Sequence, residues 1–85
     1  MSVADLPAGA SFTVHRILLG GEVGKRLADM GFTEGAEGSV VRRGFLRGPL
    51  HVTIRGYALL IRRSEAASIE VRTALEAGTD SGQPR

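Results

Sequence analysis

The amino-acid sequence predicts a small, mainly β domain: a barrel of about five short strands, with one helix after the first strand and a short helical turn before the last. Three observations predict it. The chain has 85 residues, enough for one domain with a modest core. Its 12 glycines separate short apolar runs, as turns between strands do. Residues 50–55 (LHVTIR) alternate strictly between apolar and polar side chains, which is the pattern of a half-buried strand.

Five segments are predicted to be strands. Residues 11–19 alternate around Phe12 and Val14 before two glycines end the run. Residues 37–43 and 50–55 flank an expected loop over 44–49, and residues 57–63 are the expected hairpin partner of 50–55. Residues 69–73 form the last predicted strand. Residues 1–75 are therefore assigned to one domain, and residues 76–85, which are polar and contain Gly and Pro, to a flexible C-terminal tail.

One helix is predicted over residues 22–30. Val23, Leu27 and Met30 fall at helical spacing on one face. Gly31 stands where helices often need a left-handed residue, and Gly24 is expected to allow close packing. Residues 64–67 are predicted to form a single helical turn with Ser64 as its N-cap.

A strand register follows from the turns. A Gly at the first central position favours a type II′ turn over Gly56-Tyr57, which would pair Ile54 with Leu59. The resulting sheet has an inward row of aliphatic side chains, Val41, Val52 and Ile61, and an outward row, Arg42, His51 and Arg62. A slip by one residue would move arginines into the core, so the inward and outward faces are strongly specified.

The charge distribution indicates an anionic partner. From residue 38 to residue 64 there is no acidic side chain, whereas the same stretch carries Arg42, Arg43, Arg47, Arg55, Arg62 and Arg63. Such a block suits an acidic protein face, a phosphate, nucleic acid or lipid headgroups, and the alternative is a solvated strand face. Within it, Phe45, Leu46 and Arg47 combine apolar area with an arginine, as interface hot spots do. In the alternative interpretation, Phe45 and Leu46 fold down and cap the barrel.

Several kinds of chemistry find no support in the sequence. There is no cysteine, and no phosphate-binding loop of the G-x-x-x-x-G-K-[ST] type. The serines have no histidine and acid partners in a nucleophilic arrangement, so the chain is not expected to be an enzyme. His15 and Glu22, with an acid from a second molecule, could hold zinc or iron, and the alternative is that both histidines are ordinary exposed polar residues. No cofactor is expected to be required.

The membrane and secretory signals are also missing from the sequence. The longest uncharged hydrophobic stretch, residues 57–61, is far shorter than the about 20 residues of a membrane span. The N-terminus has no basic region followed by an apolar core, so no signal peptide is expected and the predicted location is the cytoplasm.

Two segments of the chain carry motifs of a known family. Residues 26–35 (RLADMGFTEG) fit the pattern R-L-x-x-M-G-[LF]-x-x-G. Residues 52–71 (VTIRGYALLIRRSEAASIEV) fit the pattern [IV]-x-[IV]-x-G-x-x-[IL]-[AL]-[LI]-R-x-x-[ED]-A-x-x-[IV]-x-[VI]. Together these motifs resemble the signature and the ending of the FeoA family, the small cytosolic proteins of bacterial ferrous iron uptake. The resemblance covers roughly residues 5–73. It implies an SH3-like barrel, no enzymatic activity and a partner, the membrane-embedded GTPase-permease FeoB.

The loop over residues 45–49 (FLRGP) departs from the family's P-L-G-D-P pattern, because it has no acid and carries a bulky aromatic side chain. Specificity at this loop is therefore expected to differ. The leading hypothesis is a module that binds the iron transporter through Phe45, Leu46 and Arg47 beside Arg42, His51 and Arg62. A metal-responsive protein, in which His15 or His51 binds iron or zinc and changes the association state, is the alternative, and a homodimer stays open. A nucleic-acid-binding barrel is a weaker alternative, since Phe45 and Tyr57 are too few aromatics for a stacking platform, so no nucleic acid is expected.

Overall fold

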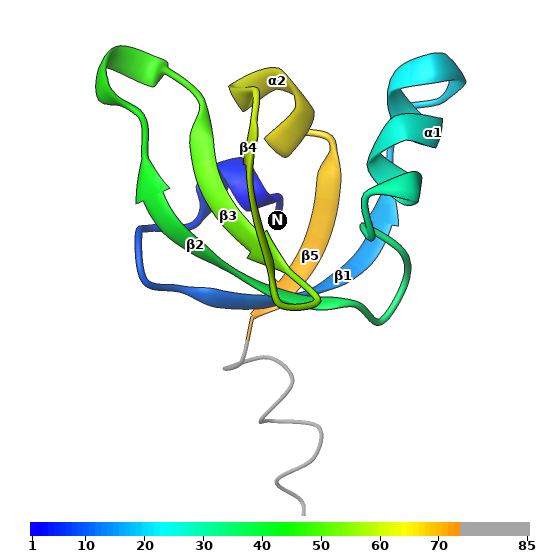
Figure 1. The fold of residues 1–85 in the computed structure, drawn as a ribbon, viewed down its shortest axis with the longest axis horizontal. Helices are drawn as coiled ribbons and strands as arrows, with labels where there is room; N and C mark the ends of the chain where they lie inside the picture. The colour runs from blue at the N-terminus through cyan, green and yellow to red at the C-terminus, as the bar shows by residue number, and fades with distance from the viewer. Residues whose placement is uncertain (74–85) are drawn as a thin grey trace, which may run out of the picture.

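Five antiparallel strands form one sheet that curls into an open barrel in the computed structural model, which describes residues 1–73 (Figure 1). Along the chain the elements are η1 (Val3–Asp5), β1 (Ser11–Ile17), α1 (Gly21–Asp29), β2 (Glu37–Arg43), η2 (Phe45–Arg47), β3 (Leu50–Ile54), β4 (Tyr57–Ile61), α2 (Arg63–Ala66) and β5 (Ile69–Thr73), where η marks a short 3-10 turn. The order across the sheet is β4-β3-β2-β1-β5. The predicted fold class is confirmed. The predicted tail, residues 76–85, lies outside the described residues.

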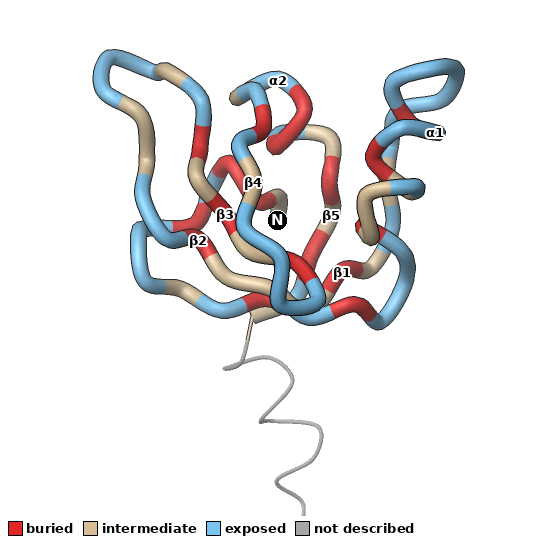
Figure 2. Tube along the Cα trace, viewed as in Figure 1, coloured by how far each residue is buried: buried red, intermediate tan, exposed pale blue. Residues whose placement is uncertain are grey.

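The core fills the concave side of the curled sheet. Buried positions recur along the strands around the interior, while the turns are exposed (Figure 2). Leu27 of α1 and Phe32 just after it are at most 1% exposed, as are Val52 and Ile54 of β3. Burying a side chain of this size stabilises the fold by about 1.5–3 kcal/mol. Helix α1 is therefore held to the sheet mainly through Leu27 and the residue that follows its C-terminus.

Helix α1 starts one residue before the predicted helix and ends at Asp29. A Cβ at Gly24 would lie 2.1 Å from the backbone oxygen of Leu19, so this glycine does allow the close packing expected of it. Gly31 has a φ of +115°, and the N–H of Phe32 donates to the Leu27 oxygen at 3.0 Å. Val23 was expected on the buried face, but it is 38% exposed. Of the three residues predicted to face the core, only Leu27 is fully buried.

The predicted turn between β3 and β4 was wrong, and as a result the predicted pairing of the two strands was displaced by two residues. The turn is Arg55-Gly56, with φ values of 50° and 87°, and a positive φ at both central positions is the type I′ geometry. Ile54 therefore pairs with Tyr57, and Val52 with Leu59. Because the error is an even number of residues, Leu59 and Ile61 keep the inward face that was predicted for them. The strand ends at Ile61, so Arg62 lies beyond it.

A bulge in β2 makes one member of the predicted inward row wrong. Val40 pairs with Val52 and Arg42 with His51, so Val41 is the extra residue between them. Val40 is fully buried, whereas Val41 is 47% exposed. Val40 therefore takes the core position that was predicted for Val41.

The remaining edge elements are short. The N-terminal segment covers the outer edge of β5, through a bridge between Ser2 and Glu70 and a hydrogen bond of 2.9 Å from the Val71 N–H to the Met1 oxygen. Helix α2 begins at Arg63, not at the predicted position after Ser64. Its N-terminus is capped by Glu65, whose Oε1 accepts from the Arg62 N–H at 2.9 Å. The predicted Ser64 cap was therefore wrong.

Candidate partner-binding surface

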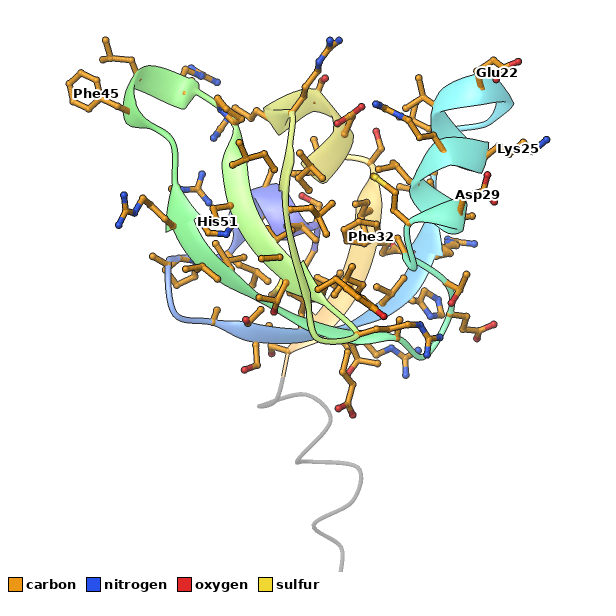
Figure 3. The ribbon with its side chains drawn as sticks, in the orientation of Figure 1. Glu22, Lys25, Asp29, Phe32, Phe45 and His51 are labelled. Carbon is orange, nitrogen blue, oxygen red and sulfur yellow. The ribbon has the colours of Figure 1, made fainter. Side chains whose placement is uncertain are left out.

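The η2 turn is the most exposed apolar feature of the described chain. Phe45 is 87% exposed and Leu46 81% exposed, so neither folds down to cap the barrel. Figure 3 shows Phe45 at the tip of the turn, directed away from the sheet. The turn lies at the same end of the barrel as α1 and α2, and away from the β3–β4 turn (Figure 1). Two large side chains are thus presented to solvent at one end of the molecule.

The backbone holds the η2 turn in a specific shape. Leu46 and Arg47 have φ values of 53° and 65°, an uncommon conformation for residues with side chains. The Gly48 N–H donates to the Phe45 oxygen at 3.0 Å. A Cβ at Gly44 would lie 2.3 Å from the Pro49 oxygen, so the two ends of the loop approach too closely for any larger residue. The exposed pair is therefore carried on a tightly closed loop.

The outward row predicted for this sheet is only partly correct. Arg42 and His51 are cross-strand neighbours, as predicted. The residue opposite His51 on β4 is Leu60, which is 67% exposed, rather than Arg62. Arg62 is exposed but lies at the N-terminal end of α2. The row on the outer face is thus Arg42, His51 and Leu60, with an apolar side chain in place of an arginine.

The arginines of the acid-free stretch divide into two groups. Arg43 donates to the backbone oxygens of Ala4 and Leu6, so it ties β2 to the N-terminal segment. Arg55 donates to the Thr33 hydroxyl at 2.9 Å. The other four have no side-chain hydrogen bond or ion pair within residues 1–73: Arg42, Arg47, Arg62 and Arg63. These four leave their positive charge available to an anionic partner.

A buried carboxylate joins the two helices at the η2 end of the barrel. Glu65 of α2 is 6% exposed, and its side chain accepts from the Arg26 guanidinium of α1 and from the Arg62 N–H. Sequence analysis did not identify this pair, because the partners are 39 residues apart. Both lie within the two family motifs, which is the one signal that could have drawn attention to them. The pair connects α1 to α2 at the end of the barrel that also carries the exposed turn (Figure 1).

The predicted metal ligands occupy separate hollows. Glu22 lines a shallow hollow on α1 with Val23, Lys25, Arg26 and Asp29; Figure 3 shows Glu22, Lys25 and Asp29 on that helix. His15 lines another hollow, with its Nε2 3.9 Å from Oε1 of Glu70. The same oxygen accepts from the Arg16 guanidinium at 2.8 Å, which lowers the pKa of Glu70. Within residues 1–73, no three His, Asp or Glu side chains come together as a metal would need.

In residues 1–73, no helix is long and apolar enough to cross a membrane. The longest helix there, α1, has nine residues.

Comparison with known proteins identifies the family. The model of the FeoA domain matches residues 1–73. The solution structure of a FeoA protein from Chlorobium tepidum is 35% identical and superposes with a TM-score of 0.83, covering 100% of this chain and 78% of that one. The crystal structure of Stenotrophomonas maltophilia FeoA complexed with zinc, described as a prokaryotic SH3 domain protein, is 29% identical with a TM-score of 0.75, covering 85% of this chain and 89% of that one.

A longer relative contains the same domain. A fusion of Fe(2+) transport protein A with the Fe(2+) transporter FeoB, from Porphyromonas gingivalis, is 33% identical over 81 residues, which is 95% of this chain. The chain spans 10% of the length of that fusion protein. From the family match and these structures, the chain belongs to the FeoA domain family of small, non-catalytic accessory proteins with an SH3-like fold.

Proposed function

We propose that this chain is an accessory domain of ferrous iron uptake that binds the cytosolic part of a FeoB-type GTPase-permease. The relative in which an A protein and FeoB form one polypeptide supports the partner, because fusion keeps two associating domains together. The proposed location is the cytoplasm, at the membrane only through the partner. The observation that carries the proposed contact is the exposure of Phe45 and Leu46 at the end of a closed loop.

The proposed contact surface combines Phe45 and Leu46 of η2 with His51 and with three of the arginines whose side chains have no partner within residues 1–73. Phe45 and Leu46 supply the apolar centre, and Arg47 follows them in the same turn. Arg42 and His51 lie on the outer face of β2 and β3, and Arg62 at the start of α2. An apolar centre with arginines at its margin is a common composition of protein interfaces. The partner face is expected to be an apolar pocket with acidic residues around it.

The test is a binding measurement with the purified cytosolic GTPase domain of the organism's FeoB protein. Replacing Phe45 and Leu46 together with alanine should weaken the affinity at least about 100-fold, since each buried anchor contributes about 2 kcal/mol. Tyr57→Ala is the matched control, because Tyr57 is 74% exposed but lies at the β3–β4 turn, at the other end of the barrel. Unchanged binding by the double variant would show that η2 is not the contact.

A second candidate function is zinc or iron binding between two copies of the chain. It is supported by the relative that was solved with zinc and by the approach of His15 to Glu70. Because residues 1–73 of one copy do not complete a ligand set, a second molecule would have to supply the rest, with Glu22 as one candidate.

Calorimetry and sedimentation with zinc or ferrous ion test this candidate. Metal should release heat and shift the chain toward a dimer in the natural protein, and neither effect should occur in the His15→Ala variant. His51→Ala is the control, because His51 lies in the row with Arg42 and Leu60. Equal heats from the natural protein and the His15→Ala variant would exclude this histidine as a ligand.

A further inference from the structure

Within residues 1–73, strand β4 is an uncovered edge of the sheet. It is the first strand in the order β4-β3-β2-β1-β5 and has only β3 as a neighbour within residues 1–73. The opposite edge, β5, is covered by the N-terminal segment through the Ser2–Glu70 bridge and the hydrogen bond from Val71 to Met1. The described part of the barrel therefore has one edge that is protected and one that is not.

The register shows which backbone groups of β4 face outward. The Arg55 N–H donates to the Glu37 oxygen of β2, so the odd-numbered residues of β3 pair toward β2 and the even-numbered ones toward β4. In an antiparallel ladder the hydrogen-bonded pairs alternate, so Tyr57, Leu59 and Ile61 bond to Ile54, Val52 and Leu50. The N–H and C=O groups of Ala58 and Leu60 then point away from β3. Both residues are exposed, and Leu60 is 67% exposed.

This edge lacks the features that usually prevent strand pairing. Its five residues, Tyr57–Ile61, include no charge and no proline. Natural edge strands commonly carry a lysine, a proline, a bulge or a covering segment. The β3–β4 pairing is regular, and the bulges of this sheet are in β1–β5 and β2–β3 pairing instead. An uncharged edge with outward donors and acceptors is suited to accept an additional strand.

Charge at both ends of the edge indicates what that strand contains. Arg55 precedes β4, and Arg62 and Arg63 follow it, with no acidic residue anywhere between residues 38 and 64. An added strand with acidic residues at its ends would be attracted at both ends. A second copy of this edge, centred in antiparallel register on Leu59, would instead bring Arg55 of each copy toward Arg63 of the other, and like charges directly opposite are destabilising.

We propose that the β4 edge binds an extended segment of a partner protein by strand addition, and that this segment has apolar residues at its centre and acidic residues at its ends. The contact consists of backbone hydrogen bonds from Ala58 and Leu60, with Leu60 packing beside an apolar side chain of the added strand. The inference depends on the free edge and its charges. It does not depend on the η2 contact, so each of the two can fail without the other.

The experiment is an NMR titration of the full chain with a synthetic peptide that has a Val-Thr-Val-Thr-Val centre and two glutamates at each end. Binding should shift the amide signals of Ala58 and Leu60 most and slow their hydrogen exchange at least about 10-fold. Two control peptides have the same length. One is N-methylated at alternate residues, which removes the donors on one edge, and the other has lysines in place of the glutamates. Both should bind at least about 10-fold more weakly.

A variant of the protein separates backbone pairing from side-chain contact. Leu60→Pro removes an outward N–H without removing a bond to β3, and proline is tolerated at such edge positions. Leu60→Thr keeps the N–H and is the matched control. The proline variant should lose binding while the threonine variant keeps it. The proposal is wrong if the N-methylated peptide binds as well as its parent, or if the chemical shift changes lie outside β4. It is also wrong if hydrogen exchange at Ala58 and Leu60 slows as the protein concentration rises without peptide, because that would indicate pairing with a second copy. If the Leu60→Pro variant does not fold, the comparison of the parent peptide with its N-methylated form still tests the proposal.

Discussion

Replacing Gly38 with alanine is expected to destabilise this domain by more than about 3 kcal/mol, because the sheet leaves no room for a side chain there. Gly38 lies in β2 between Phe12 of β1 and Ile54 of β3. A Cβ at this position would lie 2.2 Å from the Thr53 oxygen and 2.8 Å from Cζ of Phe12. The first of these atoms is backbone within a sheet, so relief requires that two strands separate.

Thermal and urea denaturation followed by circular dichroism would measure the effect. For a domain of this size, a loss of 3 kcal/mol lowers Tm by roughly 12–24 °C. Gly20→Ala is the control, because a Cβ there meets nothing within 4 Å and its φ of −100° suits any residue. Because Gly20 is the N-cap of α1, where alanine is less favoured than glycine, the control is expected to lower stability by at most about 1 kcal/mol. A Gly38→Ala protein with the natural Tm would mean that β2 and β3 are not this close.

The second large effect is expected at Glu65. Its carboxylate is 6% exposed and accepts from Arg26 and from the Arg62 N–H. Glu65→Ala removes the cap of α2 and leaves the Arg26 guanidinium without its partner. Breaking a buried pair costs about 3–5 kcal/mol, and because the Arg26 side chain is 54% exposed we expect about 2–3 kcal/mol here. Glu65→Gln keeps an oxygen for the Arg62 N–H and should cost about half as much.

A double-mutant cycle of Glu65→Ala with Arg26→Met isolates the ion pair from the cap. The two losses in unfolding free energy should be non-additive by about 1 kcal/mol, since either substitution alone breaks the same contact. Glu34→Ala is the control, because Glu34 is exposed and no hydrogen bond or ion pair of its side chain occurs within residues 1–73. Strict additivity would show that Glu65 acts through the cap alone. Loss of partner binding with little loss of stability would instead connect the pair to the arrangement of α1 and α2 at the η2 end of the barrel (Figure 1).

Local patterns in the sequence predicted most of the elements. The bounds of β2 and β5 agree with the predicted ranges 37–43 and 69–73, because alternation ends there at glycine or at a change of period. The helix was predicted within one residue at either end. The fold class and the pairing of Arg42 with His51 were predicted correctly, since each depends on side-chain polarity over a few residues. The exposure of Phe45 and Leu46 was one of two alternatives, and only the structure decides it.

The predictions that were wrong depended on backbone conformations that the pattern of side chains does not encode. Arg55 adopts a positive φ in the β3–β4 turn, a conformation that sequence rules assign to Asn, Asp or Gly, so the pairing was misjudged and Arg62 was placed opposite His51. The bulge at Val41 has no marker, because Val40 and Val41 are chemically identical and only packing decides which one is buried.

The candidate partner-binding surface was likewise determined partly by the sequence and partly by the tertiary structure. The sequence alone established a small β domain with an acid-free arginine stretch and an apolar loop, because composition and alternation are properties of neighbouring residues. Only the tertiary structure showed that Phe45 and Leu46 are exposed, which arginines are already bonded, that Glu65 joins α1 to α2, and that β4 has a single neighbouring strand within residues 1–73. Those features depend on contacts between residues far apart in the chain, and a single sequence records neither the strand order nor the distances that produce them.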